Sequence, residues 1–132
     1  MITHDYNTKV YYKDIDQMGV VYYTRYLEYF EAARTEMLKA MGLIVTDIEN
    51  EGFFLPVVSA HCDYKQGANF EDEIIIRSTI NELPKARLRI NYDVLKDNDL
   101  LASGYTIHGF TDHDGNVKRP PKSFQRVMKN YF

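Results

Sequence analysis

The sequence is poor in cysteine, since Cys62 is the only one among its 132 residues. No disulfide can form within the chain, and no cluster of thiols can hold zinc. The four histidines, at positions 4, 61, 108 and 113, do not have the spacing of a helical pair of metal ligands. We therefore expect neither a metal site nor a cofactor.

Long apolar runs are also missing, and no segment approaches the ~20 apolar residues of a membrane-spanning helix. The first ten residues, MITHDYNTKV, are polar and lack the apolar core of a secretion signal. The net charge of −3 gives no general attraction to nucleic acid or to an anionic membrane. We expect a cytoplasmic protein with no membrane span and no nucleic-acid partner, in which an anionic ligand needs a local basic patch.

The composition is that of an ordinary globular protein, with 45% hydrophobic and 27% charged residues. No repeat, low-complexity tract or linker divides the chain. A chain of this length can bury a real core without disulfides or metals. Residues 1–132 are therefore expected to form a single domain.

One long helix is predicted from Tyr23 to Met41, with Gly42 as its end. Its apolar stripe consists of Tyr26, Phe30, Ala33, Met37 and Ala40. Its polar stripe consists of Glu28, Glu31, Thr35 and Lys39. Further apolar residues widen the first stripe, as on a helix that is largely surrounded by other elements.

The rest of the chain is predicted to be mainly strands. Strands are expected within residues 7–14, 53–68, 73–83, 86–97 and 98–112. A helical turn capped by Thr46 or Asp47 is expected at 46–52, and a short helix at 120–132. This order favours an α+β fold in which an antiparallel sheet of about five strands packs on one helix. One helix cannot cover both faces of such a sheet, so we expect an exposed edge or face to form a dimer.

The stretch DIDQMGVVYY, residues 14–23, places two acids and a glycine directly before the long helix. Residue chemistry alone leaves two interpretations open. Asp14 and Asp16 can be plain turn and cap residues. Alternatively, one of them is a catalytic carboxylate that faces the free backbone amides of the first helical turn.

The longer stretch VYYKDIDQMGVVYYTRYLEYFEAARTEML resembles the N-terminal signature of the hotdog-fold acyl-CoA thioesterases. It is most similar to the 4-hydroxybenzoyl-CoA thioesterase family and its Tol-Pal-associated branch. The matching positions are Asp14, Asp16, Gly19, Val20, Val21, Tyr22, Tyr26 and the EAARTEML of the helix. The similarity continues more weakly through VVSAHCDYKQGANFEDEIIIRSTI and RPPKSF.

The resemblance implies a sheet wrapped around the helix and a homodimer whose two sheets join edge to edge. A homotetramer is the alternative, which depends on how the sheet faces pack. It also implies an active site at the dimer interface, with Asp16 as the catalytic acid and the amide near Tyr23 as the group that polarises the thioester carbonyl. Many members of the Tol-Pal-associated branch carry histidine where this chain has Tyr23. This protein would therefore act without that imidazole.

The chemistry of thioester hydrolysis agrees with this assignment. Asp16 can take a proton from water, or attack the carbonyl to form a mixed anhydride, and the sequence leaves both routes open. Amides at a helix start can stabilise the oxyanion. Gly19 permits a tight turn. The apolar stretch of Val20, Val21 and Tyr22, with Tyr26, offers contacts to an acyl group, although tyrosines at such positions also commonly belong to the core.

Three basic residues, Lys85, Arg87 and Arg89, stand two apart, so an extended backbone places them on one face. Arginine is well suited to phosphate recognition. Coenzyme A carries phosphate groups, and relatives of the family place basic residues in this region. The three side chains are therefore candidates for nucleotide binding, with a solvated strand face as the alternative.

The predicted activity is hydrolysis of an acyl-CoA to a free acid and coenzyme A. Acyl carrier protein is an alternative carrier, because it presents the same phosphopantetheine arm. A non-catalytic hotdog module that binds acyl groups would not need a carboxylate at Asp16. A hotdog dehydratase normally uses a histidine, and His4 is the only one before the long helix.

Overall fold

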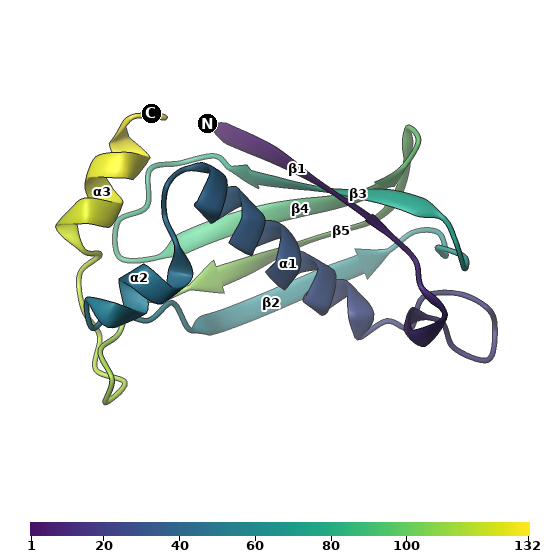
Figure 1. Ribbon diagram of the computed structural model, residues 1–132, viewed down its shortest axis with the longest axis horizontal. Coiled ribbons are helices and arrows are strands. Elements are labelled where there is room, and N and C mark those ends of the chain that lie inside the picture. Colours follow the sequence, from purple (N-terminus) through teal and green to yellow (C-terminus); the bar gives the residue numbers. More distant parts are fainter.

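A computed structural model describes residues 1–132 as one antiparallel sheet with a long helix across one face (Figure 1). The strands are β1 (Ile2–Lys9), β2 (Val57–Tyr64), β3 (Glu73–Ile80), β4 (Leu88–Lys96) and β5 (Asp99–His108). The helices are α1 (Arg25–Ala40), α2 (Val45–Asn50) and α3 (Lys122–Lys129), and a 3-10 turn, η1, covers Tyr12–Asp14. The strands lie in the order β1-β3-β4-β5-β2. The expected α+β fold with five strands around one long helix is confirmed.

The core lies between α1 and the sheet. The strand expected within 86–97 is confirmed as β4, and its alternate residues Leu88, Ile90, Tyr92 and Val94 are all buried. The Phe30 ring stacks on Tyr92 with a centroid distance of 4.3 Å. Gly104 allows this close approach, since a Cβ there would lie 2.1 Å from the His61 carbonyl oxygen and 2.9 Å from the Phe30 ring.

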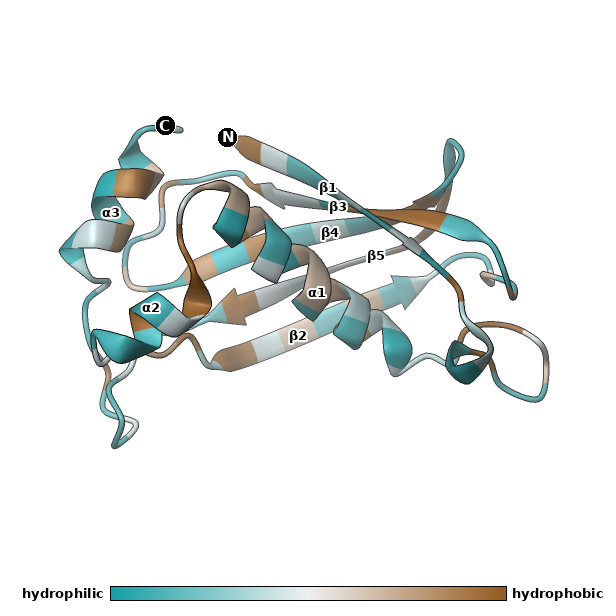
Figure 2. Cartoon of the chain, viewed as in Figure 1, coloured by the Kyte–Doolittle hydropathy of each residue, from teal (hydrophilic) through white to brown (hydrophobic).

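The predicted stripes of α1 are confirmed except at one position. The polar stripe is fully exposed, and Figure 2 shows hydrophilic colour on much of the viewer-facing side of the helix. Ala40, expected on the apolar stripe, is exposed at the last residue of α1. Of the apolar residues beside this stripe, Leu27 is 43% exposed.

Two predicted elements needed correction. The first strand covers Ile2–Lys9 rather than 7–14, because polar residues of β1 pair along the whole of β3 and the chain then turns at η1. The helical turn α2 starts at Val45, so Thr46 and Asp47 lie inside it, and the N-cap is Ile44 without a side-chain bond. Short elements of this kind depend on tertiary pairing, which local residue preferences do not encode.

The strand β2 forms an open edge of the sheet, since it pairs only with β5. Pro56 directly precedes it, and proline is typical of edge strands because it cannot donate a hydrogen bond to a neighbouring strand. Val57 and Val58 are 46% and 51% exposed, and hydrophobic colour marks the start of this strand in Figure 2. This is the exposed edge that the sequence predicted. None of the helices is both long and apolar enough to cross a membrane.

A chain of buried polar groups crosses the core beneath α1. The hydroxyls of Tyr92 and Thr106 are 2.7 Å apart, and Thr106 Oγ1 lies 2.9 Å from His108 Nε2. His108 Nδ1 lies 3.1 Å from the Leu55 carbonyl oxygen. A neutral His108 satisfies the chain, with Nδ1–H donating to Leu55 and Nε2 accepting from Thr106. Burial lowers the pKa of His108 below its ordinary value.

We predict that the free energy of unfolding decreases as the pH falls below about 6.5, because the unfolded chain then binds a proton that folded His108 resists. His108→Gln should flatten this dependence. The measurement is urea unfolding of both proteins between pH 7.5 and pH 5. Equal pH slopes for the two proteins would contradict the assignment to His108.

Candidate active site

The candidate carboxylate, Asp16, stands at the start of a tight turn. Its N–H donates to the Val20 carbonyl at 2.9 Å, and its own carbonyl accepts the Gly19 N–H at 3.0 Å. Gly19 has φ of +80°, a conformation that favours glycine. One carboxylate oxygen accepts the Met18 N–H at 2.8 Å, while the other accepts no hydrogen bond from the chain. The half-buried Asp16 therefore keeps one oxygen free for chemistry.

Backbone hydrogen bonds join the turn to the residues that directly precede α1. Ile15 and Val21 form an antiparallel bridge, and the Tyr22 N–H donates to the Asp14 carbonyl at 2.8 Å. The next two amides, of Tyr23 and Thr24, have no acceptor in the chain. Both lie at the positive end of the helix dipole. The structure thus places free amide donors just beyond the turn that carries Asp16.

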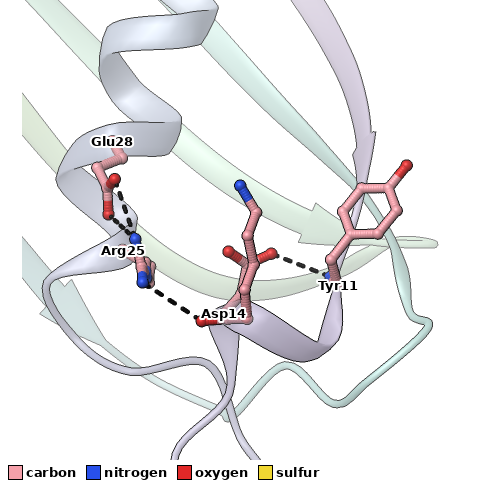
Figure 3. A network of polar contacts seen from close by, with 5 residues as sticks. Tyr11, Asp14, Arg25 and Glu28 are labelled. Atoms are coloured by element: carbon pink, nitrogen blue, oxygen red, sulfur yellow. Dashed lines mark hydrogen bonds and ion pairs between the residues drawn. The ribbon is translucent and has the colours of Figure 1, made fainter.

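Asp14 has a different environment from Asp16. It is only 5% exposed, and its carboxylate accepts the Tyr11 N–H at 3.0 Å (Figure 3). Arg25 binds Glu28 and also donates to the Lys13 carbonyl at 3.3 Å. These contacts favour the interpretation of Asp14 as a turn residue.

Three tyrosines surround the start of the helix. Tyr22 and Tyr23 are 45% and 57% exposed, and their rings lie 4.8 Å apart. The hydroxyl of Tyr64 donates to the Tyr23 carbonyl at 3.1 Å. Sequence reasoning missed Tyr64, because its position next to the site follows only from the place where β2 ends.

The other predicted acyl contacts divide into two groups. Val20 is partly exposed and bridges to Asn69. Val21 and Tyr26 are 5% and 2% exposed and belong to the core. The structure therefore buries Val21 and Tyr26 in the core, in agreement with the alternative that the sequence left open for Tyr26.

The predicted basic group lines one hollow of about 660 Å³. The lining residues are Asn81, Glu82, Leu83, Pro84, Lys85, Arg87, Arg89 and Asn91. Lys85 and Arg87 precede β4, so strand alternation does not align them as expected, and the loop before β4 brings them together instead. Arg89 lies over the Tyr105 ring, with Cζ 4.0 Å from its centroid.

This hollow and Asp16 lie at opposite ends of the sheet within one chain. Leu88 and Val57 both pair with His108, so the hollow adjoins the start of β2. The Asp16 turn contacts Ala68 and Asn69, shortly after the end of β2. A single chain therefore does not bring the basic side chains to Asp16.

The chain matches the family described as the Thioesterase-like superfamily over residues 10–129. The acyl-CoA thioesterase YbgC of Haemophilus influenzae is 30% identical over 125 residues, which cover 94% of this chain and 90% of the relative. The 1,4-dihydroxy-2-naphthoyl-CoA hydrolase of a Synechocystis strain is 31% identical over 111 residues, which cover 82% and 80%.

Solved structures agree with this match. The hypothetical protein TT1821 of Thermus thermophilus superimposes with a TM-score of 0.92 at 31% identity, covering 99% of this chain and 98% of that one. Slr0204, a 1,4-dihydroxy-2-naphthoyl-CoA thioesterase from Synechocystis, gives a TM-score of 0.88 at 26% identity, with 97% and 96% covered. The hotdog fold implied by the sequence is thereby confirmed.

We predict that Gly19→Ala lowers the free energy of unfolding by about 1 kcal/mol, because alanine is strained at a positive φ. No atom lies within 4 Å of the added Cβ, so strain alone acts. Gly115→Ala is a matched control with φ of +82° and equally open space. Urea unfolding should show similar losses for both variants.

Amide hydrogen exchange distinguishes the two variants. The Asp16 amide, which closes the turn, should exchange faster in Gly19→Ala and not in Gly115→Ala. Unchanged exchange at Asp16 in both variants would show that Gly19 does not hold this turn.

Proposed function

Since the chain belongs to the thioesterase-like superfamily and is a thioester hydrolase, we propose that it hydrolyses an acyl-CoA to a free acid and coenzyme A. The observation that carries the proposal is the pair formed by the Asp16 turn and the free Tyr23 amide. The names of two relatives, an acyl-CoA thioesterase and a 1,4-dihydroxy-2-naphthoyl-CoA hydrolase, support a CoA thioester as substrate. Membership of the Tol-Pal-associated branch stays a prediction.

In the proposed reaction, the free oxygen of Asp16 takes a proton from water while the hydroxyl adds to the thioester carbonyl carbon. The negative charge that develops on the carbonyl oxygen is stabilised by the Tyr23 amide, and one such donor is typically worth roughly 10²–10³ in rate. The carbon–sulfur bond then breaks, and the CoA thiolate takes the proton from Asp16, which restores the carboxylate. Direct attack by Asp16, followed by hydrolysis of the anhydride, uses the same two groups.

The open edge of β2 supports a homodimer in which two β2 strands pair antiparallel about a twofold axis. That pairing sets the start of one β2 beside the end of the other. The basic hollow of one copy then lies at the same end of the joined sheet as Asp16 of the second copy. The sheet order makes this geometry a direct consequence of edge pairing.

Strand spacings indicate which hollow serves which carboxylate. In the proposed dimer, β4 of one copy is separated from β2 of the second copy by three inter-strand spacings, through its own β5 and β2. At ~4.8 Å each, these spacings add up to about 14 Å. Within one chain, the two ends of the eight-residue β2 are about 23 Å apart at ~3.3 Å per residue step. We therefore assign the CoA phosphates to Lys85, Arg87 and Arg89 of the second copy. This basic hollow favours CoA over acyl carrier protein, the alternative carrier.

We predict that Asp16→Asn retains the fold and loses thioesterase activity by at least about 10²-fold, because it removes the base or nucleophile. Activity is measured as thiol release from short, long and aromatic acyl-CoAs. Asp114→Asn, in an exposed turn, is the matched control and should remain active. An Asp16→Asn protein with most of its activity would refute the catalytic assignment.

A combined Arg87→Gln and Arg89→Gln variant should raise KM for acyl-CoA by roughly tenfold or more, with a smaller change in kcat, because charged contacts to phosphate contribute about 1.5–3 kcal/mol each. The rise should shrink for a truncated pantetheine thioester, which lacks the nucleotide. Arg119→Gln serves as an exposed control. An unchanged KM in the combined variant would show that this hollow does not hold the nucleotide.

A further inference from the structure

Asp14 is buried, whereas Asp16 is half-buried. Its carboxylate Oδ2 accepts the Tyr11 N–H at 3.0 Å and so closes η1, the turn from which the Asp16 loop departs. Burial of a carboxylate costs free energy unless hydrogen bonds compensate for the lost hydration of its charge. The side chain of Asp14 is therefore fixed together with this turn.

The main chain of Asp14 holds the second component of the proposed site. Its carbonyl oxygen accepts the Tyr22 N–H at 2.8 Å, and Tyr22 directly precedes the residue whose amide is free. Asp16 follows Asp14 by two residues. Asp14 is thus connected to both groups of the proposed site. It is connected to Asp16 through the chain, and to the Tyr23 amide through the hydrogen bond from Tyr22.

Arg25 makes a second attachment from the first turn of α1. Its Nη2 donates to the Lys13 carbonyl, while its Nη1 is held by Glu28 at 2.9 and 3.1 Å (Figure 3). The guanidinium thereby bridges the helix and the residue before Asp14. Movement of Asp14 is restrained on both its side-chain and its main-chain sides.

Tyr29, on the next turn of α1, closes this cluster. It is 8% exposed, and it shares with Asp14 the wall of a hollow of about 300 Å³ between β1 and α1. Burial raises the pKa of Tyr29, and the negative charge of Asp14 raises it further. Asp14 therefore lies against the body of α1 and not in the exposed part of the site.

We propose that Asp14 is a positioning residue that sets the separation between the Asp16 carboxylate and the Tyr23 amide. The inference rests on the proposed function, in which these two groups act on one thioester carbonyl. Asp14 itself touches no substrate. Because a misplacement of about 1 Å can cost roughly 10²-fold in rate, such a residue affects kcat strongly without forming part of the reaction.

The test compares Asp14→Ala and Asp14→Asn with the wild-type protein. In Asp14→Ala, kcat should fall roughly 10- to 100-fold with little change in KM, and the Tyr22 amide should exchange faster with solvent. Asp14→Asn keeps an oxygen that can accept the Tyr11 N–H, so it should restore both readouts toward wild type. Thr106→Val is the control: it removes a buried, hydrogen-bonded hydroxyl far along the sheet and should cost stability without altering kcat or Tyr22 exchange.

Three outcomes are decisive. Unchanged kcat and unchanged Tyr22 exchange in Asp14→Ala would overturn the positioning role. An Asp14→Asn protein as inactive as Asp14→Ala, but with normal Tyr22 exchange, would overturn it in favour of a chemical role for the charge. Absence of turnover in the wild-type protein would refute the proposed function, and Tyr22 exchange would then decide by itself whether Asp14 holds the helix start.

Discussion

The hydrogen bond from the Tyr22 amide to the Asp14 carbonyl is the contact on which the candidate site depends. It joins the turn that carries Asp16 to the residues that begin α1. On one side of this bond, the turn is shaped by Gly19 and the Asp16 main chain. On the other side, packing of Phe30 against Tyr92 holds α1 against the sheet. The site is therefore built from a short loop that is hydrogen-bonded to the start of a well-packed helix, so the core holds the loop in place.

The same architecture leaves the site open in a single chain. The aromatic group of Tyr22, Tyr23 and Tyr64 is half exposed, and it stands at the end of an edge strand with one free side. The basic hollow that suits a nucleotide lies at the far end of the sheet. In the proposed dimer, edge pairing of two copies would cover the free strand and would bring the second hollow toward the carboxylate. The proposal therefore links assembly and catalysis through β2.

The sequence predicted the fold and the main elements, because helical spacing over 23–41 and alternation along β4 report burial directly. It also singled out Asp16 and Gly19, which the structure places in one turn. The role of Tyr64 could not be predicted, since its contact with Tyr23 spans 41 residues. The burial of Tyr26 was predicted by its place on the apolar stripe of the helix, but the residue type alone could not separate core packing from acyl contact, because an aromatic side chain suits both. The alignment of Lys85 with Arg87 arises from a loop, where alternation carries no information.

The central claim, that each site combines Asp16 of one copy with the basic hollow of the other, is tested most directly by mixing two defective proteins. Asp16→Asn subunits are exchanged with subunits that carry Arg87→Gln and Arg89→Gln, after sedimentation has confirmed that both are dimers. The account predicts that mixed dimers regain turnover with a wild-type KM, because one of their two sites then contains intact Asp16 and intact arginines. Mixed dimers whose only turnover keeps the raised KM of the arginine variant would contradict it.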